Sequence, residues 1–331
     1  MEEEKREILT ALNDLLSHNV IGDLQYRNRY NGFTAELAFQ DWFDANRSDG
    51  PIDGGMFLPA VQTGNPFEEA IYFTCSEAPP SEFVGIYTSA SSLASKGSFF
   101  IQYDTSSHYA DWERKQLFQS YENGQFVEQL FPIPPFKVFR FKPATREFSP
   151  CLITDMTAMY AKSKDFLKKK YIPAHLKNHF MHKFLQFSVK SLLKLYVERL
   201  FFDGYFNLTR TRGAPLDIDT FVRAKDGGLC LLEIKEKDIS KRDPRGFGMD
   251  LRRVESLSIL SAAFSAKAFY VVRHVNNQTQ RQFVDWRIID LEQFKSQIAY
   301  SPTVEGGTGM RSASSHNPTR VCRFEYFKLL E

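Results

Sequence analysis

The stretch "GAPLDIDTFVRAKDGGLCLLEIKEK", residues 213–237, contains two apolar, strand-like segments that carry charges at one end. The turn sequence "KDGG" separates them and predicts a hairpin. Residues 229–234, "LCLLEI", form a nearly continuous apolar run typical of a central strand, where an unpaired Glu233 would be costly. We therefore expect a mixed sheet with a polar site where these strands leave the core.

Strand alternation places the charges of this stretch on common faces. Asp217 and Asp219 share one face of the first segment. Glu233, Lys235 and Lys237 share one face of the second. On an exposed edge strand such charges would only block aggregation. The apolar run before Glu233 favours a catalytic cluster instead.

Carboxylates gathered at the end of a buried strand repel one another and lose hydration unless a cation compensates them. Asp217, Glu233 and the main-chain carbonyl of Ile234 are hard oxygen ligands of the kind that Mg²⁺ or Mn²⁺ takes. Lys235 would then hold a phosphate oxygen, orient the attacking water or stabilise developing negative charge. Asp219 is the competing first acid, either as a second ligand or as a salt-bridge partner, and Lys237 is a supporting residue.

Asp217, followed sixteen residues later by Glu233-Ile234-Lys235, resembles the PD-(D/E)xK signature of restriction endonuclease-like nucleases. The resemblance covers roughly residues 175–295, and Leu216 stands where the motif name has Pro. It implies a restriction endonuclease-like mixed sheet flanked by helices. It also implies hydrolysis of phosphodiester bonds, foremost in DNA, in a prokaryotic or phage restriction or antiviral defence setting. The family often has a further acid on the preceding helix, for which Glu198 is the candidate; the alternative is an exposed helix glutamate.

Charge is distributed unevenly along the chain. Residues 1–150 hold 12 Lys and Arg against 21 Asp and Glu, net −9, whereas the remainder holds 30 against 19, net +11. A basic second half is typical of a protein that binds a polyanion, so we expect nucleic acid as the partner. The candidate phosphate contacts are Lys168, Lys169, Lys170, Lys241, Arg242, Arg245, Arg252 and Arg253.

The proline-rich segment 131–150 predicts an edge strand and a domain boundary. Residues 1–150 would form a separate mixed α/β domain for recognition or for oligomerisation, as a homodimer or with a partner subunit. Within it we expect a helix at 33–44 and strands at 54–62, 69–76 and 83–89. Residues 151–331 would form the nuclease domain.

Cys75, Cys151, Cys230 and Cys322 lie far apart and predict reduced thiols in a cytoplasmic protein. There is no apolar run long enough to span a membrane, and the acidic N-terminus differs from a signal peptide.

His175, His179 and His182 share a helix face and could ligate a metal, but exposed helix residues are favoured because no carboxylate or Cys completes the set.

The sequence thus favours a metal-dependent nuclease. The alternative is a nuclease-fold protein that has lost catalysis and binds nucleic acid or a protein.

Overall fold

The computed structural model describes residues 2–20, 22–47, 50–61, 65–160, 165–206, 215–241, 243–305 and 318–330. The chain divides into two compact units. Unit 1 comprises Met1–Tyr26 and Asp53–Asp217, and unit 2 comprises Arg27–Ile52 and Ile218–Glu331. The expected boundary near residue 150 does not coincide with this division, because residues 151–217 fold with the N-terminal part and residues 27–52 fold with the C-terminal part.

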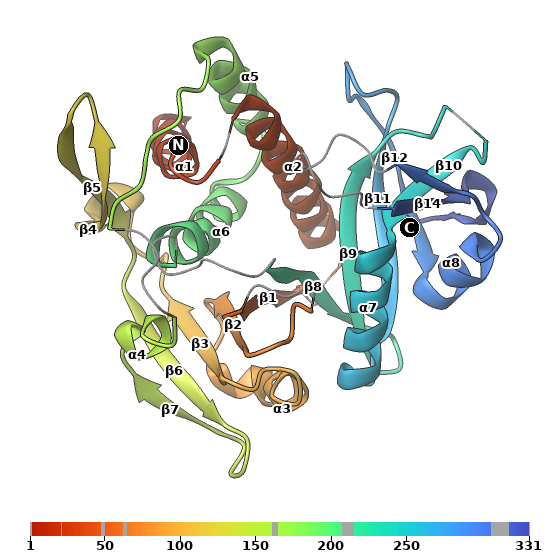
Figure 1. The fold of residues 1–331 in the computed structure, drawn as a ribbon, viewed down its shortest axis with the longest axis horizontal. Helices are drawn as coiled ribbons and strands as arrows, with labels where there is room; N and C mark the ends of the chain where they lie inside the picture. The colour runs from red at the N-terminus through yellow and green to blue at the C-terminus, as the bar shows by residue number, and fades with distance from the viewer. Residues whose placement is uncertain are drawn as a thin grey trace. The chain divides into compact units, whose positions relative to one another are not determined.

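Unit 1 is built on a mixed sheet with the strand order β1-β2-β3-β6-β7 (Figure 1). Its strands are β1 (Ile52–Pro59), β2 (Ala70–Ser76), β3 (Gly97–Tyr103), β6 (Phe136–Lys142) and β7 (Glu147–Cys151). Only the β2–β3 pair is parallel among these neighbours. The edge strand expected within residues 131–150 is therefore confirmed by β7.

The helices of unit 1 bury aromatic side chains against this sheet and against one another. They are α1 (Glu2–Ser17), α3 (Val84–Ala90), α4 (Ile153–Thr157), α5 (Ala174–Phe184) and α6 (Val189–Arg199), the last continuing as a π-helix over Leu200–Tyr205. Tyr87 of α3 donates a hydrogen bond to the Phe99 carbonyl at 2.5 Å and packs against Phe100 and Phe148. The strand predicted for residues 83–89 was wrong, since this segment is the helix α3.

Unit 2 contains the expected mixed sheet flanked by helices. Its strands, in the order β15-β12-β11-β9-β8, are β15 (Lys328–Leu329), β12 (Phe283–Asp290), β11 (Lys267–Val275), β9 (Leu229–Lys237) and β8 (Leu216–Arg223). Strands β9 and β11 run parallel, and the other neighbouring pairs are antiparallel.

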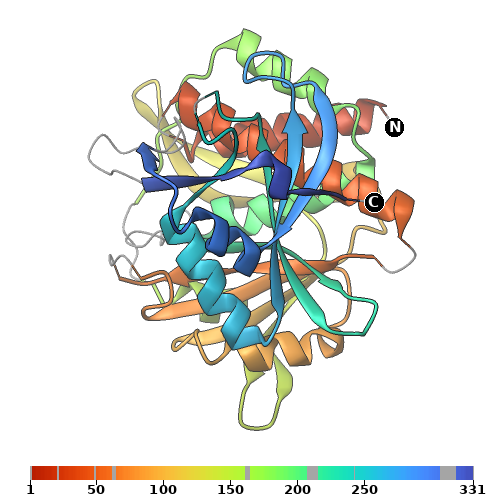
Figure 2. The ribbon, with the colours of Figure 1, turned by 90° about the vertical axis from the view of Figure 1, so that its right-hand side faces the viewer.

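Helices cover both faces of the unit 2 sheet. From one side α2 (Asp23–Asn46) packs Phe39 and Phe43 against Leu232, Ile234 and neighbouring residues of β11 and β12. On the other side lie α7 (Leu251–Phe264) and α8 (Leu291–Ile298), which lie next to each other in Figure 2. A small sheet of β10 (Gly246–Asp250), β14 (Pro318–Arg323) and β13 (Thr303–Glu305) completes the unit. Apolar side chains therefore pack against both faces of β9 up to the point where its charged residues begin.

None of the described helices is long and apolar enough to cross a membrane. The four cysteines are free thiols, as expected, with Cys75, Cys230 and Cys322 buried and Cys151 half-buried.

Candidate active site

The hairpin of β8 and β9 positions the site. Asp226 in its turn accepts a hydrogen bond from the Gly228 amide at 2.9 Å, and Gly227 takes a left-handed φ of 84° that favours glycine. Thr220 of β8 pairs with Leu232 of β9. Because the strands are antiparallel, Asp219, which precedes Thr220, lies beside Glu233, which follows Leu232. Local turn chemistry therefore sets which acid of β8 meets the acid of β9.

Asp219, Glu233 and Lys235 form one charged cluster in unit 2, in which the two carboxylates are buried and the Lys235 side chain is 34% exposed. The side chains of Asp219 and Glu233 are 2% and 1% exposed. The Lys235 ammonium lies 3.3 Å from Asp219 Oδ2 and 3.0 Å from Glu233 Oε1, so it bridges both carboxylates. Asp219 Oδ2 also accepts a hydrogen bond from the Ile234 amide at 2.6 Å. These contacts fix the relative orientation of the two carboxylates.

Arg253, in the first turn of α7, supplies the second positive charge of the cluster. Its Nε donates to Glu233 Oε2 at 2.7 Å, its Nη2 donates to the same oxygen, and Nη2 lies 4.0 Å from Asp219 Oδ1. Asp250 caps α7 by accepting from the Arg252 amide at 2.8 Å, which fixes the start of this turn. Two anions and two cations therefore balance in a site that is largely shielded from water.

The preference for Asp217 as the first acid is not supported by these contacts. Asp217 is exposed near the start of β8 and belongs to unit 1, whereas Asp219 makes the contacts to Lys235 and to the Ile234 amide. Lys237 is the last residue of β9 and is exposed. Glu198 is half-buried on α6 in unit 1.

A second buried charge cluster lies on the opposite face of β9. It was not predicted from the sequence. Glu236 accepts from Arg273 Nη1 at 2.7 Å and from Arg281 Nε at 2.5 Å, while the Arg273 guanidinium lies 5.0 Å from the centre of the Phe283 ring. The one available clue was that Glu236 has the opposite parity to Glu233 in the strand. Two arginines on one glutamate give this cluster of three residues a net charge of +1.

The donor set of the first cluster fits a hard divalent cation in its chemistry. Within the described residues, no group of three or more His, Cys, Asp or Glu side chains could hold a metal. A cation would therefore rely on Asp219, Glu233, a main-chain carbonyl and water, as Mg²⁺ commonly does. Glu233 Oε1 is buried and lies 3.0 Å from the Lys235 ammonium, so a cation bound to this oxygen would have to share it with Lys235. Arg253 would have to give up its position on the same carboxylate.

The predicted phosphate contacts are divided between the two units. Lys241, Arg245 and Arg252 are exposed in unit 2, and Arg242 lies outside the described residues. Lys168, Lys169 and Lys170 are exposed in unit 1, where Lys169 pairs with Asp14. Counted by unit, the charge asymmetry nearly disappears: 21 Lys and Arg against 22 Asp and Glu in unit 1, and 21 against 18 in unit 2. The split of −9 and +11 therefore describes the sequence halves and not the folded units.

His175, His179 and His182 are all exposed on α5, in agreement with the preferred interpretation.

No family model, no curated protein and no solved structure matches this chain.

Proposed function

We propose that this chain is a metal-dependent nuclease that hydrolyses phosphodiester bonds, with DNA as its main substrate, in restriction or antiviral defence. The observation that supports the proposal best is the pair of buried carboxylates of Asp219 and Glu233, bridged by Lys235, where the apolar strand β9 becomes charged. Two nearly buried carboxylates carry a large desolvation cost, which a structural role alone does not require. The mixed sheet flanked by helices in unit 2 is compatible with a restriction endonuclease-like fold.

Each residue of the cluster has a role in such a reaction. A divalent cation bound by Asp219 and Glu233 would supply Lewis-acid activation of the phosphodiester and lower the pKa of a water molecule. Lys235 already holds both carboxylates in place, and its remaining ammonium protons can bind a phosphate oxygen or orient the attacking water. Arg253, once it leaves Glu233, can pair with the negative charge of the phosphate.

One observation favours the alternative, a nuclease-fold protein that binds nucleic acid or a protein without cleaving. The guanidinium of Arg253 already neutralises Glu233 from within the protein. A cluster that is balanced in this way can persist without any cation. The two functions differ in whether Glu233 is needed for a chemical step.

The test is cleavage of a supercoiled plasmid and of a single-stranded oligonucleotide with Mg²⁺, Mn²⁺ or EDTA. We expect metal-dependent cleavage by the wild type and a loss of about 100-fold or more for Glu233→Gln and Lys235→Met, because Glu233 would hold the cation and Lys235 would stabilise developing negative charge. Glu255→Gln, an exposed glutamate on α7, is the matched control and should cleave normally. Equal cleavage by wild type and Glu233→Gln would refute the assignment. Nucleic-acid binding without cleavage under every condition would favour the binding module.

A further inference from the structure

The hairpin of β4 (Glu113–Glu122) and β5 (Gln125–Ile133) in unit 1 has two different faces. Its inner face carries the buried side chains of Ser120 and Gln129. Its outer face carries Tyr121, directly opposite Phe126, and these side chains are 40% and 59% exposed. Large apolar rings at the surface of a hairpin contribute little to a core, so they need another explanation.

A third ring joins this pair from a separate segment of unit 1. Leu167 forms a parallel bridge with Ser120, its amide donates to the Gln119 carbonyl at 3.0 Å, and its carbonyl accepts from the Tyr121 amide at 2.9 Å. This pairing places Phe166 against both outer rings. The ring centres of Phe166 lie 5.7 Å from Tyr121 and 5.2 Å from Phe126, and those of Tyr121 and Phe126 lie 5.2 Å apart. We call Tyr121, Phe126 and Phe166 the hairpin aromatic cluster.

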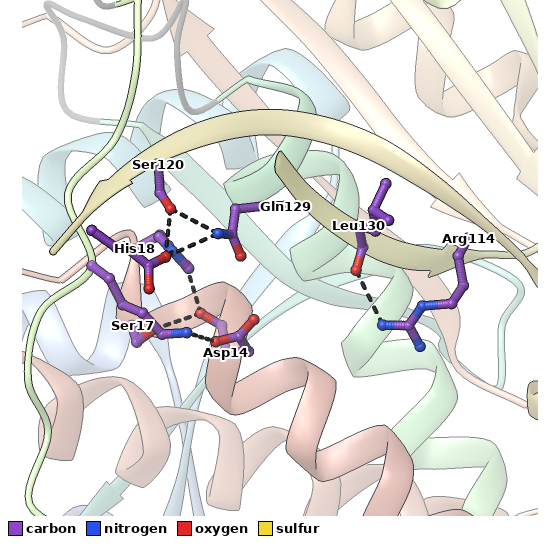
Figure 3. Close-up of polar contacts among 9 residues, drawn as sticks. Asp14, Ser17, His18, Arg114, Ser120, Gln129 and Leu130 are labelled. Atoms are coloured by element: carbon purple, nitrogen blue, oxygen red, sulfur yellow. Dashed lines mark hydrogen bonds and ion pairs between the residues drawn. The ribbon is translucent and has the colours of Figure 1, made fainter. Parts of the chain in front are cut away.

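The inner face anchors the hairpin to α1 (Figure 3). Gln129 donates to Ser120 Oγ at 2.7 Å and to Glu122 Oε1 at 2.9 Å. Buried His18, which follows α1, contacts the Asp14 carbonyl through Nδ1 at 2.9 Å and Glu122 through Nε2 at 3.5 Å. This polar network attaches the inner face of the hairpin to α1. The rings on the outer face can therefore be replaced without disrupting the fold of the hairpin.

Exposed lysines follow the cluster in the chain. Lys169 turns to Asp14 of α1, while its neighbours Lys168 and Lys170 are exposed and form no ion pair with any residue that the structure describes. Tyr171, the next residue, is 84% exposed. Glu128 is the acid exposed on the outer face of the hairpin itself. Lys168, Lys170 and Tyr171 thus follow Phe166 within five residues of the chain and are all exposed.

We propose that the hairpin aromatic cluster, with Lys168, Lys170 and Tyr171, binds single-stranded nucleic acid. Surface rings stack on unpaired bases of any sequence, and ammonium groups contact the phosphates between them. Bases in a duplex are already stacked on one another, so the surface should discriminate against double strands. The proposal deepens the nuclease proposal by naming the form of the substrate, and binding at this surface does not require the Glu233 cluster to be catalytic.

Fluorescence anisotropy in EDTA tests binding without cleavage, with labelled dT15, rU15 and a 15-base-pair DNA duplex as probes. Replacing both Tyr121 and Phe126 by Ala should weaken dT15 binding at least tenfold, since each stacked base contributes roughly 5-fold or more. Tyr300→Ala removes a tyrosine that is 98% exposed in unit 2, and it serves as the matched control with unchanged affinity. Replacing Lys168 and Lys170 by Gln should reduce the log–log salt slope by about 1.4 for single strands. The rU15 arm shows whether RNA is bound through the same surface.

Several results would overturn the proposal. They are wild-type affinity for dT15 in the Tyr121 and Phe126 double variant, tighter binding of the duplex than of dT15, or no binding of either single strand. If the protein instead self-associates and the double variant is monomeric, the surface is an interface between copies of the chain. Loss of dT15 binding in the double variant combined with normal binding by Glu233→Gln would support the surface even if no cleavage is ever found.

Discussion

Replacing Arg253 by Met tests whether the Arg253 guanidinium occupies the position on Glu233 at which a divalent metal ion would bind. The substitution leaves Glu233, whose side chain is 1% exposed, with Lys235 as its remaining cationic partner. Removing one partner of a buried ion pair costs roughly 3–5 kcal/mol. Because the Arg253 side chain is 15% exposed, we take the lower end, about 3 kcal/mol. At roughly 2–4 °C per kcal/mol, the melting temperature of the transition that includes unit 2 should fall by about 6–12 °C in EDTA.

Magnesium should reverse this loss in the variant. A ligand at 100 times its dissociation constant stabilises the folded state by about 2.7 kcal/mol, which is close to the free energy lost with Arg253. In the wild type the cation must first displace the guanidinium, so the same Mg²⁺ concentration should raise the melting temperature less. Differential scanning fluorimetry with a Mg²⁺ titration measures both quantities without any cleavage.

Two controls accompany the measurement. Arg252→Met removes the exposed neighbouring arginine and should leave the melting temperature within about 2 °C of the wild type, since exposed charges contribute little. Adding Glu233→Gln to Arg253→Met should abolish the response to Mg²⁺. An equal rise in melting temperature with Mg²⁺ for the wild type and for Arg253→Met would show that arginine and cation do not compete, and the reasoning would fail.

Three further outcomes are expected. Neutralising Lys241, Arg245 and Arg252 together should flatten the log–log salt dependence of dT15 binding by about 2, because each phosphate contact on a single strand contributes about 0.7; an unchanged slope in a salt titration would place the contacts elsewhere. Burial lowers the pKa of His18 below its ordinary value of 6.5, so the folded state binds this proton more weakly and stability falls as the pH drops below about 6.5; urea midpoints at pH 7.5 and 5.5 should differ less in His18→Gln than in the wild type. Gly246→Ala should lower the melting temperature by several degrees, since a Cβ there collides with the Cys322 carbonyl across β10 and β14, whereas Gly50→Ala meets no atom within 4 Å and should not.

Periodicity in the sequence predicted the parts of unit 2 that depend on local signals. The apolar run before Glu233 became the central strand β9, and the two strand-like segments around the "KDGG" turn became the hairpin of β8 and β9. By contrast, residues 83–89 have the aromatic and β-branched residues of a strand but form α3, because Tyr87 finds its partners in the core on β3 and β7. Burial of Tyr87 outweighed the modest strand preference of its neighbours.

The division into units could not be read from composition. A proline-rich segment near residue 150 has the composition of a linker, yet β6 and β7 there belong to the sheet of unit 1. The apolar face of α2, with Phe39 and Phe43, is complementary to the sheet formed much later in the chain. An amphipathic pattern shows that a helix has a partner but does not show which one. The uneven charge was therefore assigned to sequence halves whose bounds differ from those of the two compact units.

Which acid of β8 lies beside Glu233, in contrast, could have been read from the sequence. A hairpin register is fixed by its turn, and the "KDGG" turn here closes with the Ala224 amide on the Gly228 carbonyl at 2.8 Å. In every observed pair of β8 and β9 the two residue numbers add to 452, as in Thr220 with Leu232, so Asp219 falls opposite Glu233. Alternation alone gives Asp217 and Asp219 the same face and cannot choose between them, whereas counting from the turn does. The contact of Arg253 with Glu233 could not be predicted by such a local rule, because α7 reaches Glu233 only through its packing on the sheet. That contact makes the Arg253→Met variant the most direct test of the site.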